Sequence, residues 1–356
     1  MRLRALSPLL ATIILIAIVL SAGLVVYGML SGWIGTYSST LSIQPTSVDL
    51  VVAGDKALLS VCVKNTGNKP LAGVVVTGYD DNGKPFKLAL SPAEPGQASG
   101  NTLVIPLGVP NIVLDASGNN NHGTIYGATW TTGKNGKALL FDGASNYVAC
   151  LYSPLISGDR TWMSWIYPQT GTDPMTFYEE GVTGAGQMFY VYVSAPNTGR
   201  LAVDCWARGW YSSNPRVTIN QWNHAVFTYS GTTKNGKFFI NGVFDVETPA
   251  FTGTGFFDVN DLYVGGDPMG ASGNYYRGII DEVCVYRTQL SGQEILFSSS
   301  NPGLPVTRGL VLWLPLDEGI NNPYSFTAGS SYALTITAYS LDGSVATQTA
   351  VVRAMT

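Results

Sequence analysis

The chain has 356 residues, of which 19 are Lys or Arg and 23 are Asp or Glu, so the net charge is −4. Only 12% of the residues are charged, about half the share of an ordinary soluble domain. A hydrophobic fraction of 46% excludes a disordered chain, and the lack of a basic cluster excludes nucleic acid as a partner. A single long apolar run excludes a polytopic membrane protein, and the length predicts two or three domains.

The first predicted element is a long apolar helix near the N-terminus. Charged residues are absent from 5–48, and residues 9–30 are almost entirely apolar. A helix of this length, at about 1.5 Å per residue, spans the hydrocarbon core of a bilayer. Because Arg2 and Arg4 precede it, the positive-inside rule places the short N-terminus in the cytoplasm and the rest of the chain outside.

The residues ahead of this helix have the order of a processing signal. That order is Arg2-Leu3-Arg4-Ala5-Leu6-Ser7-Pro8. Followed by a long uncharged helix, it resembles the class III signal peptide of archaeal type IV pilins. The resemblance implies a leader over 1–5, cleavage by a prepilin peptidase between Ala5 and Leu6, and a hydrophobic helix over 6–36 on the mature protein.

Small residues in the same helix predict close helix packing. A helix that is apolar all round must be buried by lipid or by identical helices, and Gly28 and Gly32 have the spacing that lets helix backbones approach. The resemblance implies a filament of copies of this chain, assembled by pilus machinery from subunits first held in the membrane. The alternative is a plain single-pass anchor. The predicted contact residues are Pro8, Ala11, Ala17, Ala22, Gly23, Gly28 and Gly32.

Beyond residue 36 the pattern changes to short strands separated by Asn/Gly turns. The predicted strands include 57–64, 72–79, 86–90, 331–339 and 345–353. Two strands alone are not stable, so the C-terminal hairpin must complete the N-terminal strands. We therefore predict one immunoglobulin-like β-sandwich split in sequence, 37–104 plus 320–356. Its closing hairpin resembles the globular domain of archaeal pilins.

Between the two halves lies a segment, 105–319, that is rich in Trp, Tyr and Gly/Asn turns. This segment resembles the laminin-G-like, concanavalin-type jelly roll. The matching stretches start at Asp115, Gly136, Trp222, Lys237, Leu262 and Gly278. The strand at 309–319 comes first in that family but last here, which indicates a circular permutation. The predicted fold class is thus mainly β, with a long N-terminal hydrophobic helix and an immunoglobulin-like pilin domain interrupted by a laminin-G-like jelly roll.

Residues that carry catalysis are scarce. His122 and His224 are the only histidines, and no Ser/His/Asp or Cys/His arrangement is apparent. Glycosidases on this fold place their carboxylates on one face of a strand, whereas Glu179 and Glu180 are adjacent and would face opposite sides. We therefore expect that the protein is not an enzyme and needs no cofactor.

Two binding sites are candidates. Related jelly rolls often hold a structural calcium ion, for which Asp115, Asp281 and Asp317 are the candidate ligands; turn-capping acids are the alternative reading. Exposed aromatic side chains can stack on sugars, and the loop-like Trp210 and Tyr211 are the best candidates for a glycan site.

The four cysteines are expected outside the membrane, where disulfides persist. Cys150, Cys205 and Cys284 fall in the jelly roll, and Cys62 falls in the split sandwich. Either two jelly-roll cysteines pair, or Cys62 ties the domains or neighbouring subunits together.

These observations predict an extracellular archaeal type IV pilus subunit that displays the jelly roll for surface adhesion or glycan binding. Two alternatives remain open. One is a membrane-anchored, monomeric surface adhesin or lectin. The other is an extracellular enzyme that processes polysaccharides.

Overall fold

The computed structural model describes residues 39–151, 158–169, 175–181, 188–194, 199–205, 209–251, 261–266, 268 and 274–356. Contacts divide the chain into Met1–Thr40 and Leu41–Thr356, and only the second unit is considered below. The predicted leader, its cleavage site at Ala5 and Leu6, and the helix over 6–36 with all its packing residues lie outside the described residues.

The described part of the chain is nearly all β-structure. Its one α-helix is α2 (Gly292–Ser300), which begins at a capping box formed by Ser291 and Glu294. No helix among the described residues is long and apolar enough to cross a membrane. The predicted fold class, which depended on a long apolar helix, is therefore wrong and is corrected to β-sandwich and jelly roll.

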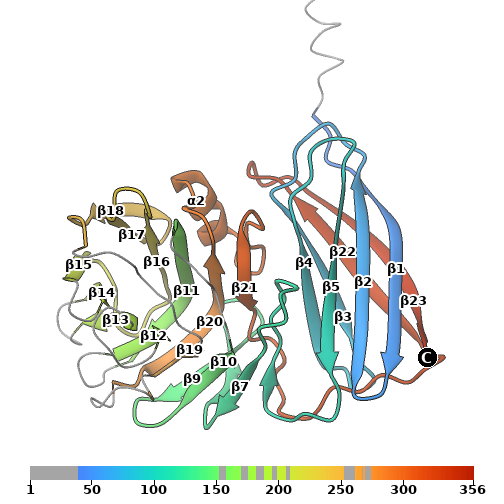
Figure 1. The fold of residues 1–356 in the computed structure, drawn as a ribbon, viewed down its shortest axis with the longest axis horizontal. Coiled ribbons are helices and arrows are strands. Elements are labelled where there is room, and N and C mark those ends of the chain that lie inside the picture. The colour runs from blue at the N-terminus through green and yellow to red at the C-terminus, as the bar shows by residue number, and fades with distance from the viewer. Residues whose placement is uncertain are drawn as a thin grey trace, which may run out of the picture. The chain divides into compact units, whose positions relative to one another are not determined.

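The first sandwich combines strands from both ends of this unit (Figure 1). Its seven strands are paired in the order β4-β3-β22-β23-β1-β2-β5. The C-terminal hairpin pairs with β3 on one side, and Leu50 pairs with Ala354 in parallel on the other. The strands are β1 (Ile43–Ala53), β2 (Lys56–Asn65), β3 (Gly73–Tyr79), β4 (Pro85–Leu90), β5 (Ala98–Pro106), β22 (Ser331–Tyr339) and β23 (Val345–Met355).

Apolar side chains alternate along these strands and enclose one hydrophobic core, which includes Leu59, Val76 and Ile336. The sheet curls so that its two edges, β4 and β5, meet. Asn101 bridges them, because its side-chain amide donates to the carbonyl of Ala89 at 2.8 Å. The C-terminal hairpin therefore supplies part of this core.

The second sandwich has two larger sheets. One is paired in the order β15-β14-β13-β12-β19-β10-β7-β6, and the other in the order β18-β17-β16-β11-β20-β9-β8, with β21 also paired to β20. The first sheet contains β6 (Ile112–Val113), β7 (Gly123–Tyr126), β10 (Tyr147–Leu151), β12 (Met175–Gly181), β13 (Met188–Ser194), β14 (Arg200–Cys205), β15 (Gly209–Pro215) and β19 (Asp261–Val264). The second contains β8 (Thr129–Thr132), β9 (Lys137–Asp142), β11 (Arg160–Pro168), β16 (Asn223–Tyr229), β17 (Gly236–Ile240), β18 (Val243–Glu247), β20 (Arg277–Tyr286) and β21 (Leu310–Leu314).

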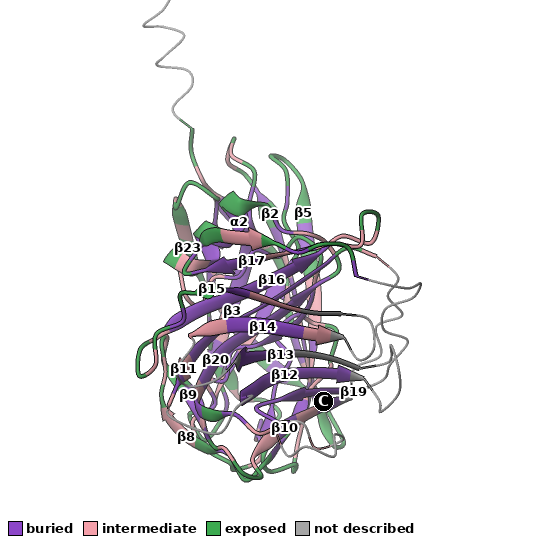
Figure 2. Ribbon diagram, turned by 90° about the vertical axis from the view of Figure 1, so that its left-hand side faces the viewer, coloured by how far each residue is buried: buried purple, intermediate pink, exposed green. Residues whose placement is uncertain are grey.

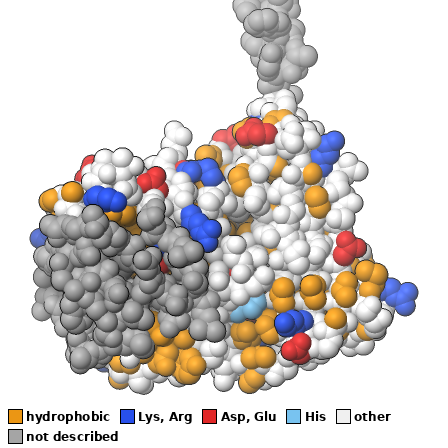
Figure 3. Space-filling model, viewed as in Figure 1, with side chains coloured by type: hydrophobic (Ala, Val, Ile, Leu, Met, Phe, Trp, Pro, Cys, Tyr) orange, Lys and Arg blue, Asp and Glu red, His pale blue; other side chains and the backbone are white. Residues whose placement is uncertain are grey.

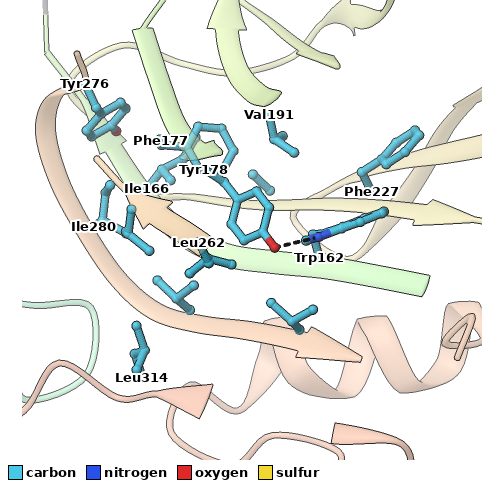
Figure 4. Packing of buried hydrophobic residues seen from close by; sticks show 14 of the residues in the cluster. Trp162, Ile166, Phe177, Tyr178, Val191, Phe227, Leu262, Tyr276, Ile280 and Leu314 are labelled. Carbon is cyan, nitrogen blue, oxygen red and sulfur yellow. Dashed lines mark hydrogen bonds between the residues drawn. The ribbon is translucent and has the colours of Figure 1, made fainter. Parts of the chain in front are cut away.

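Between these sheets lies a core rich in aromatic side chains (Figure 4). Trp162 on β11 stacks on Phe227 of β16, with ring centroids 5.9 Å apart. The indole N–H of Trp162 donates to the hydroxyl of Tyr178 at 2.8 Å, the dashed line in Figure 4. This pairing satisfies two polar groups that would otherwise be costly to bury.

A third hydrophobic cluster joins the two sandwiches. Val75 and Tyr339 of the first sandwich share it with Tyr286 and Trp313 of the jelly roll and with Phe297 of α2. Phe297 and Tyr339 stack with their ring centroids 5.6 Å apart. The outer face of the sheet that contains β11 and β20 is therefore covered.

The loop at 115–122 of the jelly roll closes the exposed edges of the first sandwich. The backbone N–H of Ala89 donates to Ala116, and that of Val104 donates to the side chain of Asn120. His122 lies against the carbonyl of Val104, with its Nε2 2.7 Å from that oxygen. Unpaired edge strands invite association with other chains, so this loop protects the sandwich.

Charged side chains are sparse on the molecular surface. Figure 3 shows a few Lys, Arg, Asp and Glu side chains among mostly uncharged groups on the described part of one face. The low overall charge is therefore a property of the folded β-domains as well as of the apolar N-terminal segment.

Candidate functional site

The jelly roll keeps one outer face that the first sandwich does not cover. It belongs to the sheet that contains β10, β19, β12, β13 and β14, which faces the viewer in Figure 2. Residues on a strand alternate between the two faces. Since Val148, Val191 and Val203 point into the core, their sequence neighbours belong to the outer face.

Three tyrosines from three strands lie together on this face. Tyr126 of β7 stacks on Tyr147 of β10, with ring centroids 4.7 Å apart and ring planes 17° from parallel. Tyr147 in turn meets Tyr263 of β19 edge to face at 6.0 Å. Tyr126 is 46% exposed, whereas Tyr263 is 9% exposed. We call these three residues the tyrosine row; it runs from the surface toward the middle of the sheet.

The strand register places further acidic and aromatic residues on the same face as the tyrosine row. Tyr263 lies opposite Glu179, Glu179 opposite Tyr190, Tyr190 opposite Asp204, and Asp204 opposite Trp210. Directly opposed residues share a face of the sheet. The side chains of Tyr190 and Trp210 lie outside the described residues, and only the backbone register places these two residues on the outer face.

The two carboxylates of this face differ in their burial. Glu179 is fully buried, whereas Asp204 is half-buried, and burial raises the pKa of the Asp204 carboxyl. A face that combines flat aromatic rings with a few polar groups is typical of ligand sites. Carboxylate oxygens accept hydrogen bonds from hydroxyl groups, and tyrosine rings offer apolar area with a polar tip.

The structure separates the two aromatic residues that the sequence singled out. Trp210 falls in register on the outer face, but Tyr211 turns to the core side. There Tyr211 packs edge to face on Phe251 at 4.8 Å, and its hydroxyl donates to the carbonyl of Ala250. Tyr211 is therefore half-buried on the core side of β15, and its role as a sugar contact stays a prediction.

The adjacent carboxylates Glu179 and Glu180 lie in different environments. Glu180 forms a fully buried ion pair with Arg160 at 2.7 Å. Its second oxygen accepts hydrogen bonds from Trp162 at 3.2 Å and Tyr178 at 3.0 Å. Glu180 is thus part of the core, and it does not share a face with Glu179.

The calcium candidates Asp281 and Asp317 lie near each other, but a lysine balances their charge. Asp281 accepts the backbone N–H groups of Lys134 and Asn135, and Asp317 forms an ion pair with Lys87 at 2.5 Å. Burial, followed by the charge of the neighbouring Glu282, raises the pKa of Asp281 to about 9. No cluster of three or more His, Cys, Asp or Glu suited to a metal occurs among the described residues.

The third candidate, Asp115, organises the loop that covers β5. Its carboxylate accepts backbone N–H groups from Ser117, Asn121 and Trp313 at 2.9–3.0 Å. Its own N–H donates to Nδ1 of His122 at 3.0 Å, so His122 is neutral and carries its proton on Nε2. Each of these bonds holds backbone, which matches the reading of a turn-capping acid.

We predict that Asp115→Ala lowers the free energy of unfolding by about 3 kcal/mol, because it leaves buried N–H groups without acceptors. Asp142→Ala is the matched control. Asp142 also accepts three backbone N–H groups, from Ala144, Ser145 and Asn146, but it is exposed and water can replace it. Urea unfolding measures both variants, and equal losses would contradict the role of burial.

Among the described cysteines, Cys62, Cys150 and Cys284 carry free thiols. Burial raises the pKa of the Cys150 and Cys284 thiols, which keeps them protonated and unreactive. The side chain of Cys205 lies outside the described residues. The structure therefore gives no pairing between Cys62 and the jelly roll.

A family of known proteins matches the jelly roll. The Laminin_G_3 family model, described as the Concanavalin A-like lectin/glucanases superfamily, matches residues 142–296. No curated protein sequence matches the chain. The chain therefore contains a concanavalin-like, laminin-G-like jelly roll.

Several solved structures resemble the chain at low sequence identity. Domain 4 of AbnA, an extracellular arabinanase of Geobacillus stearothermophilus, is 20% identical over 53% of this chain and 97% of its own, with a TM-score of 0.40. The CBM40 of the Ruminococcus gnavus IT-sialidase is 16% identical over 46% of this chain and 96% of its own, with a TM-score of 0.37. A putative carbohydrate binding protein from Bacteroides ovatus is 12% identical over 91% of this chain and 83% of its own, with a TM-score of 0.39.

These findings correct the prediction of an archaeal type IV pilin. The family that matches describes the jelly roll, and no helix among the described residues is long and apolar enough to cross a membrane. The pilin resemblance depended on a short N-terminal motif, which lies outside the described residues, and on the closing hairpin of the split sandwich. The prediction of a pilin is therefore wrong.

Proposed function

We propose that this protein is an extracellular carbohydrate-binding protein whose jelly roll binds a glycan on the outer face that the first sandwich does not cover. The observation that carries the proposal is the tyrosine row, Tyr126, Tyr147 and Tyr263, on the same face as the half-buried carboxylate of Asp204. The match to a superfamily of lectins and glucanases supports the same ligand class. The role is that of a surface adhesin or lectin.

The chemistry of the face fits a polyhydroxylated ligand. The exposed ring of the stacked pair, Tyr126, presents a flat apolar surface against which the C–H face of a sugar packs, and the half-buried carboxylate of Asp204 accepts hydrogen bonds from sugar hydroxyl groups. The opposite outer face of the jelly roll is covered where the cluster around Trp313 and Tyr286 lies, so these side chains are not accessible to a glycan. Binding is thus directed to one face of the jelly roll.

Tyr126→Ala and Tyr147→Ala are each expected to weaken glycan binding about tenfold, which corresponds to about 1.4 kcal/mol. The probe is a panel of neutral, amino and acidic oligosaccharides, and titration calorimetry on the strongest binder gives the affinity. Tyr79→Ala is the matched control, because Tyr79 is 58% exposed on the first sandwich. If the panel shows no binding, or if Tyr79→Ala weakens it equally, the site is wrong.

We further propose that the protein binds its glycan without cleaving it. Glu180, the neighbour of Glu179, is committed to the buried pair with Arg160, so these two acids do not form a pair on one face as retaining glycosidases require. Incubation of the purified protein with its bound oligosaccharide should release no new reducing ends. Their steady appearance would support the enzyme alternative.

A further inference from the structure

An enclosed lysine–aspartate pair lies where the first sandwich meets the jelly roll. Lys87 is on β4 and Asp317 follows β21, 230 residues later in the sequence. The side-chain nitrogen of Lys87 is 2.5 Å from Oδ2 of Asp317, and the two side chains are only 13% and 14% exposed. An amine nitrogen is thus held beside a carboxyl group in a site that admits little water.

The two oxygens of Asp317 have different partners. Oδ1 accepts the backbone N–H of Lys137 at 2.8 Å, whereas Oδ2 faces Lys87. Gly136 makes this approach feasible, because a Cβ at that position would lie 2.1 Å from Oδ1. The carboxyl group is therefore fixed, with a backbone donor on the oxygen that does not face the amine.

A buried carboxylic acid, Glu282, shares a neighbour with Lys87, the side chain of Trp313. Glu282 is 6% exposed, and its oxygens accept hydrogen bonds from the Trp313 indole at 2.7 Å and from Asn135 at 3.1 Å. Burial raises the pKa of Glu282 despite the opposing charge of Lys87. The Lys87 nitrogen also lies 5.5 Å from the centroid of the Trp313 ring. The pair is thus flanked by an aromatic ring and by an acid able to carry a proton.

We propose that Lys87 and Asp317 join in an intramolecular amide bond, with Glu282 as the proton carrier. This modification is independent of the proposed glycan binding. It is a condensation within the folded chain that needs no oxidant and no co-reactant. The nearby groups act through proximity and electrostatics, which are the main sources of rate in such reactions.

The atoms balance as follows. The Lys87 ammonium first passes one proton to Oδ2 of Asp317, which leaves a neutral amine and a neutral carboxyl group. The amine nitrogen then attacks Cγ, and the negative charge that develops on Oδ1 is stabilised by the N–H of Lys137. Glu282 takes a second proton from the nitrogen and returns it to Oδ2, the C–Oδ2 bond breaks, and one water leaves.

Charge on the neighbouring groups controls the first step. Burial alone lowers the pKa of Lys87, but the charges of Glu282 and Asp317 outweigh it and raise that pKa. A small cavity lined by Lys87, Asp317 and Pro315 lies beside the pair and gives the departing water a place to go.

The test is intact mass and peptide mapping of the purified full chain. The expected wild-type mass is lower than the sequence mass by one water, and a peptide containing Lys87 should be linked to one containing Asp317. Lys87→Arg keeps the positive charge but lacks the amine, so it should have the full mass, as should Asp317→Ala. Wild-type protein at full mass, with unlinked Lys87 peptides, overturns the proposal.

Two further measurements separate chemistry from folding. In Glu282→Gln, Lys87 and Asp317 are both present, yet the full mass is expected; a linked peptide there would overturn the role of Glu282. Lys69 and Asp342 form the matched control pair. The Lys69 nitrogen is 2.6 Å from Oδ2 of Asp342, almost as close as in the Lys87–Asp317 pair, but Asp342 is 54% exposed. Their peptides should stay unlinked in every variant, and circular dichroism checks that each variant is folded.

Discussion

Trp313→Ala is expected to lower the free energy of unfolding by about 4 kcal/mol, because the indole is fully buried and its loss leaves a large cavity. Trp313 belongs to the cluster shared by the jelly roll and the first sandwich. Its N–H also donates to Glu282 at 2.7 Å. The substitution therefore removes packing and a buried hydrogen bond together.

The measurement is urea unfolding followed by circular dichroism. Trp313→Phe keeps most of the ring but removes the donor, so it should lose about 1–3 kcal/mol. Val351→Ala is the control, because Val351 is 73% exposed and surface changes of this kind cost less than about 0.5 kcal/mol. A loss below about 1 kcal/mol in Trp313→Ala would show that the shared cluster does not stabilise the chain.

The same variant tests how the two sandwiches depend on each other. In the wild type a common core lies between Tyr339 of the first sandwich and Tyr286 of the jelly roll, so we expect one cooperative transition. When Trp313 is removed, that core is weakened, and the transition should split into two. Two transitions already present in the wild type would mean that the sandwiches unfold independently.

Local alternation made the strands of the first sandwich predictable from sequence. The pattern over 331–339 and 345–353 corresponds closely to β22 (Ser331–Tyr339) and β23 (Val345–Met355). These strands have one buried face, as Leu334 and Ile336 show, and a period of two marks that face clearly. The resemblance of 105–319 to a laminin-G-like jelly roll likewise agrees with the family match over 142–296.

The candidate site was not predictable in the same way. Tyr126, Tyr147 and Tyr263 come from three strands, and the last is more than a hundred residues from the first. Their meeting depends on strand order and register, and a shift of one residue would turn each ring to the other face. The alternation of buried and outward-facing residues beside Val148 and Val264 predicts that each tyrosine lies on an outer face. It does not predict that the tyrosines contact one another.

The charge partner of Asp317 was hidden for a related reason. The sequence predicts that Asp281 and Asp317 share a site, and in the fold burial, the charge of Glu282 and the charge of Asp317 all raise the pKa of Asp281. Lys87, the cation that pairs with Asp317, is on β4 of the first sandwich. A sequence examined segment by segment cannot bring these positions together, so calcium binding stays a prediction beside the alternative of turn-capping acids.

Acid is expected to destabilise the protein through His224, by up to about 5 kcal/mol at pH 3. Burial lowers the pKa of His224 to about 3, while an unfolded histidine titrates near 6.5. Between these values the unfolded chain binds a proton that the folded chain does not, so stability is full above pH 6.5 and falls as the pH decreases. Nδ1 of His224 has no hydrogen-bond partner among the described residues.

The groups around His224 explain why its protonation is costly. The His224 ring lies 5.1 Å from the Trp165 ring, measured between ring centroids. The ammonium of Lys134 lies 4.3 Å from the centroid of the same Trp165 ring. A cation on His224 would lose its hydration in this buried site, which is the cause of its lowered pKa. Glu282 lines the same small cavity, but its own raised pKa keeps it from supplying a full negative charge.

His224→Phe isolates this contribution, because it keeps an aromatic ring on Trp165 and cannot titrate. Urea unfolding from pH 8 to pH 4 should show the wild type losing about 1.4 kcal/mol more per pH unit than the variant below pH 6.5. Glu318, whose pKa is raised to about 7 by burial, has the opposite sign: its contribution is full at low pH and is lost as the pH rises through 7. Both proteins contain Glu318, so it cancels in their difference, and parallel curves below pH 6.5 would refute the role of His224.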